Sequence, residues 1–140
     1  MAGVELTALD GRFEHLRKPL SRSAAGACRF LGLSPANINI FLVNASGMKR
    51  LNLIYMQKNE VTDVIAVESP EEFPRTPADP IGEIYLNPPC ARKKHRSLEY
   101  ALVHGILHLK GFNHLNKNDK IEMEKLEQKV LTWLARTYSA

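Results

Sequence analysis

The stretch from Leu98 to Lys110 restricts the possible folds of this chain more than any other segment. Ser97 is a typical helix N-cap and Gly111 a typical helix stop, so the stretch is predicted to be a helix. Apolar residues dominate its interior: Leu102, Val103, Ile106, Leu107 and Leu109. A helix that is apolar around most of its circumference is buried, so we expect a central helix that other elements cover.

Three of the five histidines lie on or just after this helix, within eleven residues. His104 and His108 are one turn apart and share a face. Gly111 can adopt a left-handed conformation and bring His114 back over that face. Three neutral nitrogen ligands with one position open to water form the catalytic type of zinc site, although nickel, copper or iron also accept such ligands. We therefore expect one Zn²⁺, or another divalent ion, at the end of this helix.

The alternative is a helix that carries two polar residues on one face without a ligand. Burying two unpaired imidazoles among apolar side chains is costly, which favours the metal site. The spacing H-x-x-x-H-x-x-G-x-x-H also matches zinc proteases in which a glutamate after the first histidine is the general base. Gly105 stands there in this chain and cannot accept a proton, so peptide hydrolysis by that mechanism is disfavoured.

Hydrophobic periodicity predicts a mixed sheet around the central helix. The predicted strands are Val4–Leu9, Asn37–Val43, Val61–Glu68 and Ile81–Asn87, and the further predicted helices are Pro19–Leu31, Asn44–Tyr55 and Lys117–Thr137. Val4–Leu9 is expected at a sheet edge. Asn37–Val43 is apolar on both sides, which is typical of an interior strand covered on both faces. This order of elements predicts an α/β or α+β fold with about four strands and about four helices.

The whole chain, residues 1–140, is expected to form one domain. Four prolines in residues 69–80 indicate a loop that does not divide this domain. In the last predicted helix, the expected buried stripe is Met123, Leu126, Val130 and Trp133. Two cysteines, Cys28 and Cys90, are too few for a disulfide framework, so we expect no disulfide partner and a core position for Cys28.

The formal net charge of +4 favours an acidic partner such as RNA. A basic run precedes the central helix and consists of Arg92, Lys93, Lys94, His95 and Arg96. Its charges would hold an RNA backbone close to the metal ligands, although a solvated loop is the plainer interpretation.

No apolar segment reaches the roughly 20 residues of a membrane helix, and the first ten residues lack the pattern of a signal peptide. We expect a cytoplasmic protein without a membrane partner. An organelle protein whose transit peptide has been removed is the alternative.

Two longer motifs resemble the YbeY family of metal-dependent endoribonucleases. His104-Gly-Ile-Leu-His108-Leu-Lys-Gly111-Phe-Asn-His114 is similar to the family hallmark H-G-x-L-H-L-x-G-[YF]-D-H. The segment from Leu51 to Val67 is similar to L-N-x-x-Y-R-x-K-D-x-x-T-D-V-L-S-F, and Gly82-Glu83-Ile84 to G-[DE]-I. The resemblance implies single-strand-specific cleavage during ribosomal RNA maturation, near the 3′ end of the small-subunit RNA. It also implies that the small ribosomal subunit and its assembly factors are partners.

The chain departs from the family pattern at positions near the expected site. Met56 replaces an arginine that the resemblance places beside the phosphate, and Asn113 replaces the aspartate before the last histidine. Further replacements are Asn59, Ala66 and Val67. Lys58 is the nearest candidate for the missing cation, with a solvated lysine as the alternative. Asn113 would orient His114 or a bound water through its amide.

Thr62 and Asp63 match the family segment, which lies near the cleft. Asp63 would serve either the site or the backbone at the start of a strand. The leading hypothesis is therefore a metal-dependent endoribonuclease of ribosomal RNA. A catalytically impaired ribosome-assembly or RNA-binding factor that retains zinc is the alternative, and another metal-dependent hydrolase such as a peptidase is the third.

Overall fold

The computed structural model describes residues 3–33, 37–69, 80–112 and 116–138. Its centre is a sheet whose strands lie in the order β1-β2-β4-β3. The strands are β1 (Val4–Ala8), β2 (Asn37–Leu42), β3 (Val64–Glu68) and β4 (Pro80–Leu86). Strands β1, β2 and β4 run parallel, and β3 runs antiparallel to β4. The mixed four-stranded sheet and the edge position of β1 confirm the predicted fold class.

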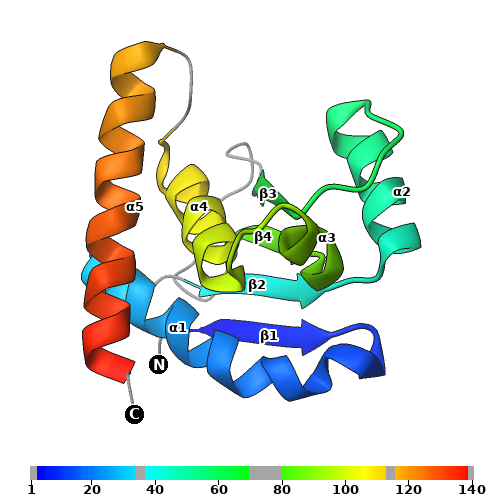
Figure 1. Cartoon of the computed structure of the whole chain (residues 1–140), viewed down its shortest axis with the longest axis horizontal. Coiled ribbons are helices and arrows are strands. Elements are labelled where there is room, and N and C mark those ends of the chain that lie inside the picture. Colours follow the sequence, from blue (N-terminus) through cyan, green and yellow to red (C-terminus); the bar gives the residue numbers. More distant parts are fainter. Residues whose placement is uncertain (1–2, 34–36, 70–79, 113–115, 139–140) are drawn as a thin grey trace.

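Five α-helices and one 3-10 helix surround this sheet within the described ranges (Figure 1). They are η1 (Gly11–Leu16), α1 (Arg17–Phe30), α2 (Ala45–Met56), α3 (Pro88–Lys93), α4 (Leu98–Lys110) and α5 (Lys117–Tyr138). Helix α3 was not predicted. Pro88 and Pro89 end β4 as expected, but a proline is equally suited to the first turn of a helix. The side chain of Asn87 caps that turn, since its Oδ1 accepts a hydrogen bond from the Cys90 N–H at 2.9 Å.

One face of the sheet forms the main core together with α1, α4 and α5. Ile38, Ile40 and Leu42 of β2 point to this face and are fully buried. Cys28 of α1 lies in the same core, as predicted, and burial raises the pKa of its thiol to about 11. Helix α4 is buried between the sheet and α5, which confirms the expected central helix (Figure 1).

A glycine lets α4 pack directly on the sheet. A Cβ at Gly105 would lie 3.2 Å from Cγ2 of Ile84 and 3.3 Å from Cγ2 of Val64, closer than most carbon contacts. At the end of the helix, Gly111 has φ 111° and its N–H donates to the carbonyl of His108. The predicted start, end and stop residue of this helix are therefore confirmed.

The other face of the sheet is covered less than the sequence predicts. Phe41 of β2 and Tyr85 of β4 stack there at 5.3 Å between ring centroids, and both are only partly buried. They pack with Met48 of α2, which covers only part of this face. The interior position of β2 is therefore confirmed, and the cluster under α2 covers this second face of the strand only in part.

The buried stripe of α5 also differs from the prediction. Its buried residues are Met123, Glu127, Val130 and Leu134. Leu126 and Trp133, which were expected in the stripe, are only partly buried. The helix is thus rotated about its axis relative to the prediction, and this rotation brings a glutamate into the interior.

The predicted loop at 69–80 lies largely outside the described residues, which resume at Pro80. Its two ends lie together, because Ser69 Oγ donates to the Pro80 carbonyl at 2.8 Å and Ser69 N–H to the Ile81 carbonyl at 3.0 Å. Pro80 itself belongs to β4, and β3 begins at Val64 rather than at Val61. Among the helices described, none is long and apolar enough to cross a membrane.

Candidate metal centre and cleft

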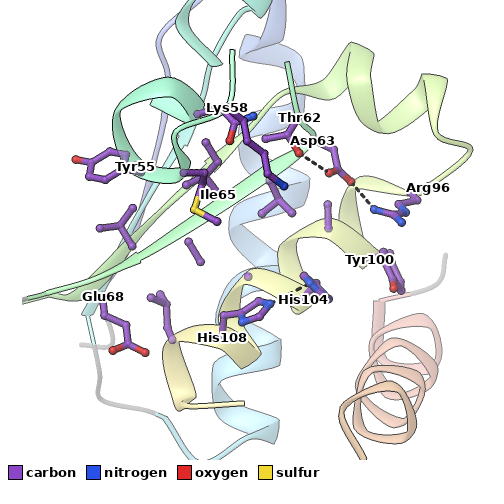
Figure 2. Close-up of a pocket in the computed structure, with 18 of the residues that line it drawn as sticks. Tyr55, Lys58, Thr62, Asp63, Ile65, Glu68, Arg96, Tyr100, His104 and His108 are labelled. Atoms are coloured by element: carbon purple, nitrogen blue, oxygen red, sulfur yellow. Dashed lines mark hydrogen bonds and ion pairs between the residues drawn. The ribbon is translucent and has the colours of Figure 1, made fainter. Parts of the chain in front are cut away.

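His104 and His108 lie on the same face of α4, as their spacing predicts. Their Nε2 atoms are 3.1 Å apart, and the ring planes meet at 75°. Two nitrogens that each lie about 2.0–2.1 Å from one tetrahedral zinc ion are about 3.3 Å apart. The two imidazoles therefore have nearly the spacing that a shared metal ion requires (Figure 2).

Glu127 approaches His104 from the neighbouring helix α5. Its Oε1 lies 3.0 Å from Nδ1 of His104, and the residue is 1% exposed. An ionised carboxylate can only accept a hydrogen bond, so Nδ1 of His104 would carry the hydrogen and Nε2 would be the nitrogen that faces a metal ion. In this structure the same Nε2 lies in hydrogen-bond contact with Nε2 of His108. A carboxylate of this kind commonly orients a histidine that binds a metal.

The second oxygen of Glu127 supports the same interpretation. Oε2 is buried and has no hydrogen-bond partner among the residues that the structure describes. A buried carboxylate left in this state is costly unless a positive charge compensates for it. A cation bound at the histidine pair would supply that charge. Sequence reasoning missed Glu127, although a glutamate within the apolar periodicity of α5 was the available signal.

The third predicted ligand, His114, lies outside the described residues, as does Asn113. Within the described ranges, no group of three histidine, cysteine, aspartate or glutamate side chains is suited to hold a metal ion. The described residues thus place two of the three predicted ligands side by side. His104, His108 and His114 as ligands, Asn113 as an orienting group and zinc as the metal stay predictions.

The two histidines line a cleft of about 730 Å³ between α4 on one side and the segment after α2 on the other. Strand β3 and the start of α4 complete its walls. Lys58 lines the cleft and reaches into it from the side opposite the histidines (Figure 2). In the described part of the chain no salt bridge joins Lys58 to a carboxylate. Its charge is therefore available to a ligand in the cleft.

Asp63 organises the basic side of the cleft. Lys94 Nζ lies 3.3 Å from one of its carboxylate oxygens and Arg96 Nη1 lies 3.3 Å from the other. Asp63 is 2% exposed. Burial alone would raise the pKa of this carboxyl, but the charges and hydrogen bonds of Lys94 and Arg96 outweigh burial and leave the pKa below its ordinary value. Asp63 thus holds two cations at the cleft. The sequence analysis had left open whether it serves the site or the backbone at the start of a strand, and here it serves the site indirectly, through Lys94 and Arg96.

The structure divides the basic run that was predicted to bind RNA. Lys94 and Arg96 line the cleft, while Lys93 is exposed and lines no described cavity. Arg92 lines a smaller groove on another side of α3. The run therefore contributes to two separate surfaces, and RNA binding by its residues stays a prediction.

Tyr100 lies between Arg96 at the rim of the cleft and His104. Its ring stacks beside His104 at 6.0 Å, and the Arg96 guanidinium lies 5.8 Å from its centroid. Burial, followed by the negative charge of Glu127, raises the pKa of Tyr100, so its hydroxyl stays protonated at neutral pH. Tyr100 thus adds an aromatic surface and a hydrogen-bond donor, neither of which the sequence analysis singled out.

A model of the family described as Endoribonuclease YbeY matches residues 12–135. The chain belongs to this family. A YbeY endoribonuclease of Lacticaseibacillus casei is 33% identical over 107 residues, which cover 67% of this chain and 70% of the relative. One from Thermodesulfovibrio yellowstonii is 35% identical over 109 residues, covering 68% of this chain and 65% of the relative.

One solved structure, of a protein from Thermotoga maritima, covers 97% of this chain and 94% of its own length, with 24% identity and a TM-score of 0.48. The sequence comparisons therefore carry the assignment. They confirm the predicted family, and with it the class of RNA-cleaving hydrolases.

Against the YbeY pattern, Met56 is the departure that bears most directly on this cleft. Its side chain lines the cleft and is 53% exposed, so an uncharged thioether stands where the resemblance expects a guanidinium. The described cations of the cleft are instead Lys58, Lys94 and Arg96. The positive charge near a bound phosphate would thus come from the segments after α2 and after α3 and not from position 56.

Proposed function

We propose that this chain is a metal-dependent, single-strand-specific endoribonuclease of ribosomal RNA. Small-subunit RNA near its 3′ end is the proposed substrate, and the small ribosomal subunit and its assembly factors are the proposed partners. Family membership supports RNA as the substrate class. The cytoplasm is the proposed location, since ribosomes are assembled there.

The observation that carries this proposal is the histidine pair at one side of a cleft that three cations and three carboxylates line: Lys58, Lys94 and Arg96, and Glu60, Asp63 and Glu68. The Nε2 atoms of His104 and His108 are 3.1 Å apart, and Oε1 of Glu127 lies 3.0 Å from Nδ1 of His104, so Nε2 is the nitrogen that would bind a cation. These residues, with His114 as the proposed third ligand, would hold one Zn²⁺. When bound, such an ion acts as a Lewis acid and lowers the pKa of a coordinated water to about 7.

The chain's own residues then hold and orient the RNA. Lys58, Lys94 and Arg96 bring positive charge to the cleft, where negative charge develops on the phosphate during cleavage. Tyr100 brings an aromatic ring to the cleft wall between His104 and Arg96, and an unstacked base, which single-stranded RNA provides and duplex RNA does not, would pack against this group. Asn113 is proposed to orient His114 or the attacking water through its amide, because an amide cannot act as a general base.

The test combines metal content with RNA cleavage in matched variants. Wild-type protein, His108→Ala and the cleft variant Lys58→Gln are compared on a single-stranded ribosomal RNA fragment, with and without a chelator. We expect near-stoichiometric metal and chelator-sensitive cleavage in the wild type, and loss of both in His108→Ala. Lys58→Gln should keep its metal and cleave about tenfold more slowly or worse. A wild-type protein that binds no metal after zinc is added would rule out the proposal.

A second candidate is a ribosome-assembly factor that has retained the metal but lost cleavage. Met56 in the cleft is the observation that favours it. Metal and RNA binding without cleavage in the wild type, with cleavage gained in Met56→Arg, would support this candidate. Peptidase activity is disfavoured, because Gly105 replaces the general base and packs against Ile84 and Val64.

A further inference from the structure

A second groove lies beside α3 and is lined by neither His104 nor His108. Its volume is about 290 Å³, and η1, α3 and the turn before α4 line it. The lining residues are Arg12, Phe13, His15, Leu16, Pro88, Ala91, Arg92, Arg96 and Leu98. They divide into a basic rim and an apolar floor, and no carboxylate is among them.

The rim carries three arginines and a histidine. Arg12 donates from Nε and Nη2 to the carboxylate of Asp10 at 3.0 and 2.7 Å, while its side chain stays 75% exposed. This two-point contact fixes the guanidinium and leaves further N–H donors free, although Asp10 offsets part of its charge. Arg92 and His15 are exposed. Fixed and free cations around one hollow are suited to a ligand that carries several phosphates.

Arg96 belongs to both hollows. It lines the histidine cleft, where Asp63 holds its guanidinium, and it also lines the second groove. Lys94 and Arg92, two and four residues earlier, line the cleft and the groove respectively. Basic side chains therefore extend from the cleft, across Arg96, to Arg12 and Arg92, with Asp63 and Asp10 each paired to part of this charge.

We propose that this second groove is a binding subsite for single-stranded RNA, occupied by a nucleotide next to the segment held in the histidine cleft. The phosphates would contact Arg12 and Arg92, and the base would lie on the partly exposed side chains of Leu16 and Leu98. Phe13 supports this floor from the core, with the Arg12 guanidinium 5.8 Å from its ring centroid. The proposal rests on the proposed RNA-cleaving function and extends it beyond the cleft.

The shape of the groove distinguishes single-stranded RNA from other acidic ligands. Its volume is slightly below the roughly 300–1,000 Å³ of ordinary ligand pockets, which suits one nucleotide rather than a folded domain. An apolar floor serves an unstacked base, which free phosphate lacks and a duplex keeps paired. Because Arg96 lines both the cleft and the groove, an RNA strand bound in one would continue directly into the other.

The test measures the affinity of zinc-loaded protein for labelled oligouridines of about 4 and about 12 nucleotides, within the usual range of single-strand site sizes. The variant Arg12→Gln with Arg92→Gln removes two charges from the groove. The matched control, Arg29→Gln with Arg136→Gln, removes two charges from exposed positions that line neither hollow. The groove variant should bind the longer RNA about tenfold more weakly and the shorter one within about twofold of wild type.

The salt dependence gives a second readout. Each lost phosphate contact on a single strand should lower the slope of log affinity against log salt by about 0.7, so the groove variant should lose about 1.4. The control should keep the wild-type slope. Equal binding of the longer RNA by the groove variant and the control would overturn the subsite, as would an equal loss for both RNA lengths.

Failure of the proposed function looks different. If the wild type binds RNA without cleaving it, the proposed cleavage fails while the subsite stands, whereas a wild type that binds neither RNA removes both proposals. Arg12 also stabilises Asp10, so a groove variant with a lowered melting temperature is replaced by Arg92→Glu, whose side chain is exposed. This variant should bind the longer RNA more weakly and the shorter RNA like the wild type. Unchanged affinity for the longer RNA would count against the subsite.

Discussion

Glu127 is the residue that we expect to set the strength of metal binding. Its carboxylate accepts a hydrogen bond from Nδ1 of His104 inside the core, and losing such a partner typically lowers metal affinity 10- to 100-fold. Glu127→Ala should therefore bind zinc about 10- to 100-fold more weakly, measured by competition with a chromophoric chelator. Glu127→Gln keeps an acceptor oxygen and should recover part of the loss.

Glu122→Ala is the control for that experiment, because Glu122 is an exposed glutamate on the same helix. It should bind zinc like the wild type. Circular dichroism of all three variants verifies that they are folded. Wild-type zinc affinity in a folded Glu127→Ala protein would show that the contact does not position His104.

Asp63 should make stability depend on pH in the acid range. Lys94 and Arg96 lower its pKa in the folded state, so its contribution is complete above the ordinary value of 3.8 and is lost as the pH falls through the lower folded value. Asp63→Asn should lower the free energy of unfolding at pH 7 by about 1–2 kcal/mol, less than for a fully buried pair because both cations are partly exposed. Urea unfolding measures this loss.

The difference between wild type and Asp63→Asn should shrink near about pH 2–3, where the carboxyl is protonated in the folded protein as well. Glu5→Gln, at an exposed position of β1, should change stability little at either pH. A difference that stays constant from pH 7 to acid would show that the ion pairs do not contribute.

At the scale of elements, the contact of α4 with the sheet holds the histidines in place. A Cβ at Gly105 would lie 3.2 Å from Ile84, so Gly105→Ala must push the helix or the side chain away. Overpacking of this kind costs about 1–3 kcal/mol, and the better helix propensity of alanine returns up to about 1 kcal/mol. We expect a net loss of about 1 kcal/mol, measured by urea unfolding.

Gly11→Ala provides the comparison, because nothing lies within 4 Å of a Cβ at that position. Its free energy of unfolding should stay within about 0.5 kcal/mol of wild type. If Gly105→Ala were instead more stable than wild type, helix propensity would dominate and the close packing of α4 would not be limiting.

At the scale of the whole molecule, zinc binding should stabilise the fold. The site exists only when α4 and α5 are packed, so zinc at about 100 times its dissociation constant should add about 2.7 kcal/mol. For a chain of this length, that corresponds to an increase of roughly 10 °C in the melting temperature. Differential scanning calorimetry with and without zinc measures this shift.

His108→Ala should abolish the zinc-dependent shift. His15→Ala should keep it, because His15 lines the second groove and not the histidine cleft. An equal shift in His108→Ala and wild type would mean that zinc stabilises the protein from another site.

Local signals in the sequence were sufficient for the elements themselves. Among the described residues, period-two and period-3.6 patterns located the four strands and four of the five α-helices, but not the 3-10 helix η1, and Ser97 and Gly111 marked the ends of α4. The pairing of His104 with His108 was predictable as well, because residues four apart on a helix share a face. Helix α3 was missed because prolines serve equally as strand ends and helix starts.

The surroundings of the site depended on contacts between distant segments. Glu127 meets His104 across 23 positions, and Asp63 meets Lys94 and Arg96 across 31 and 33. The sequence by itself determined the family motifs, the helix and the facing histidines, because these follow from local spacing. Only the tertiary structure decided which charges surround them, because the rotation of α5 and the packing of α4 on the sheet depend on the whole core.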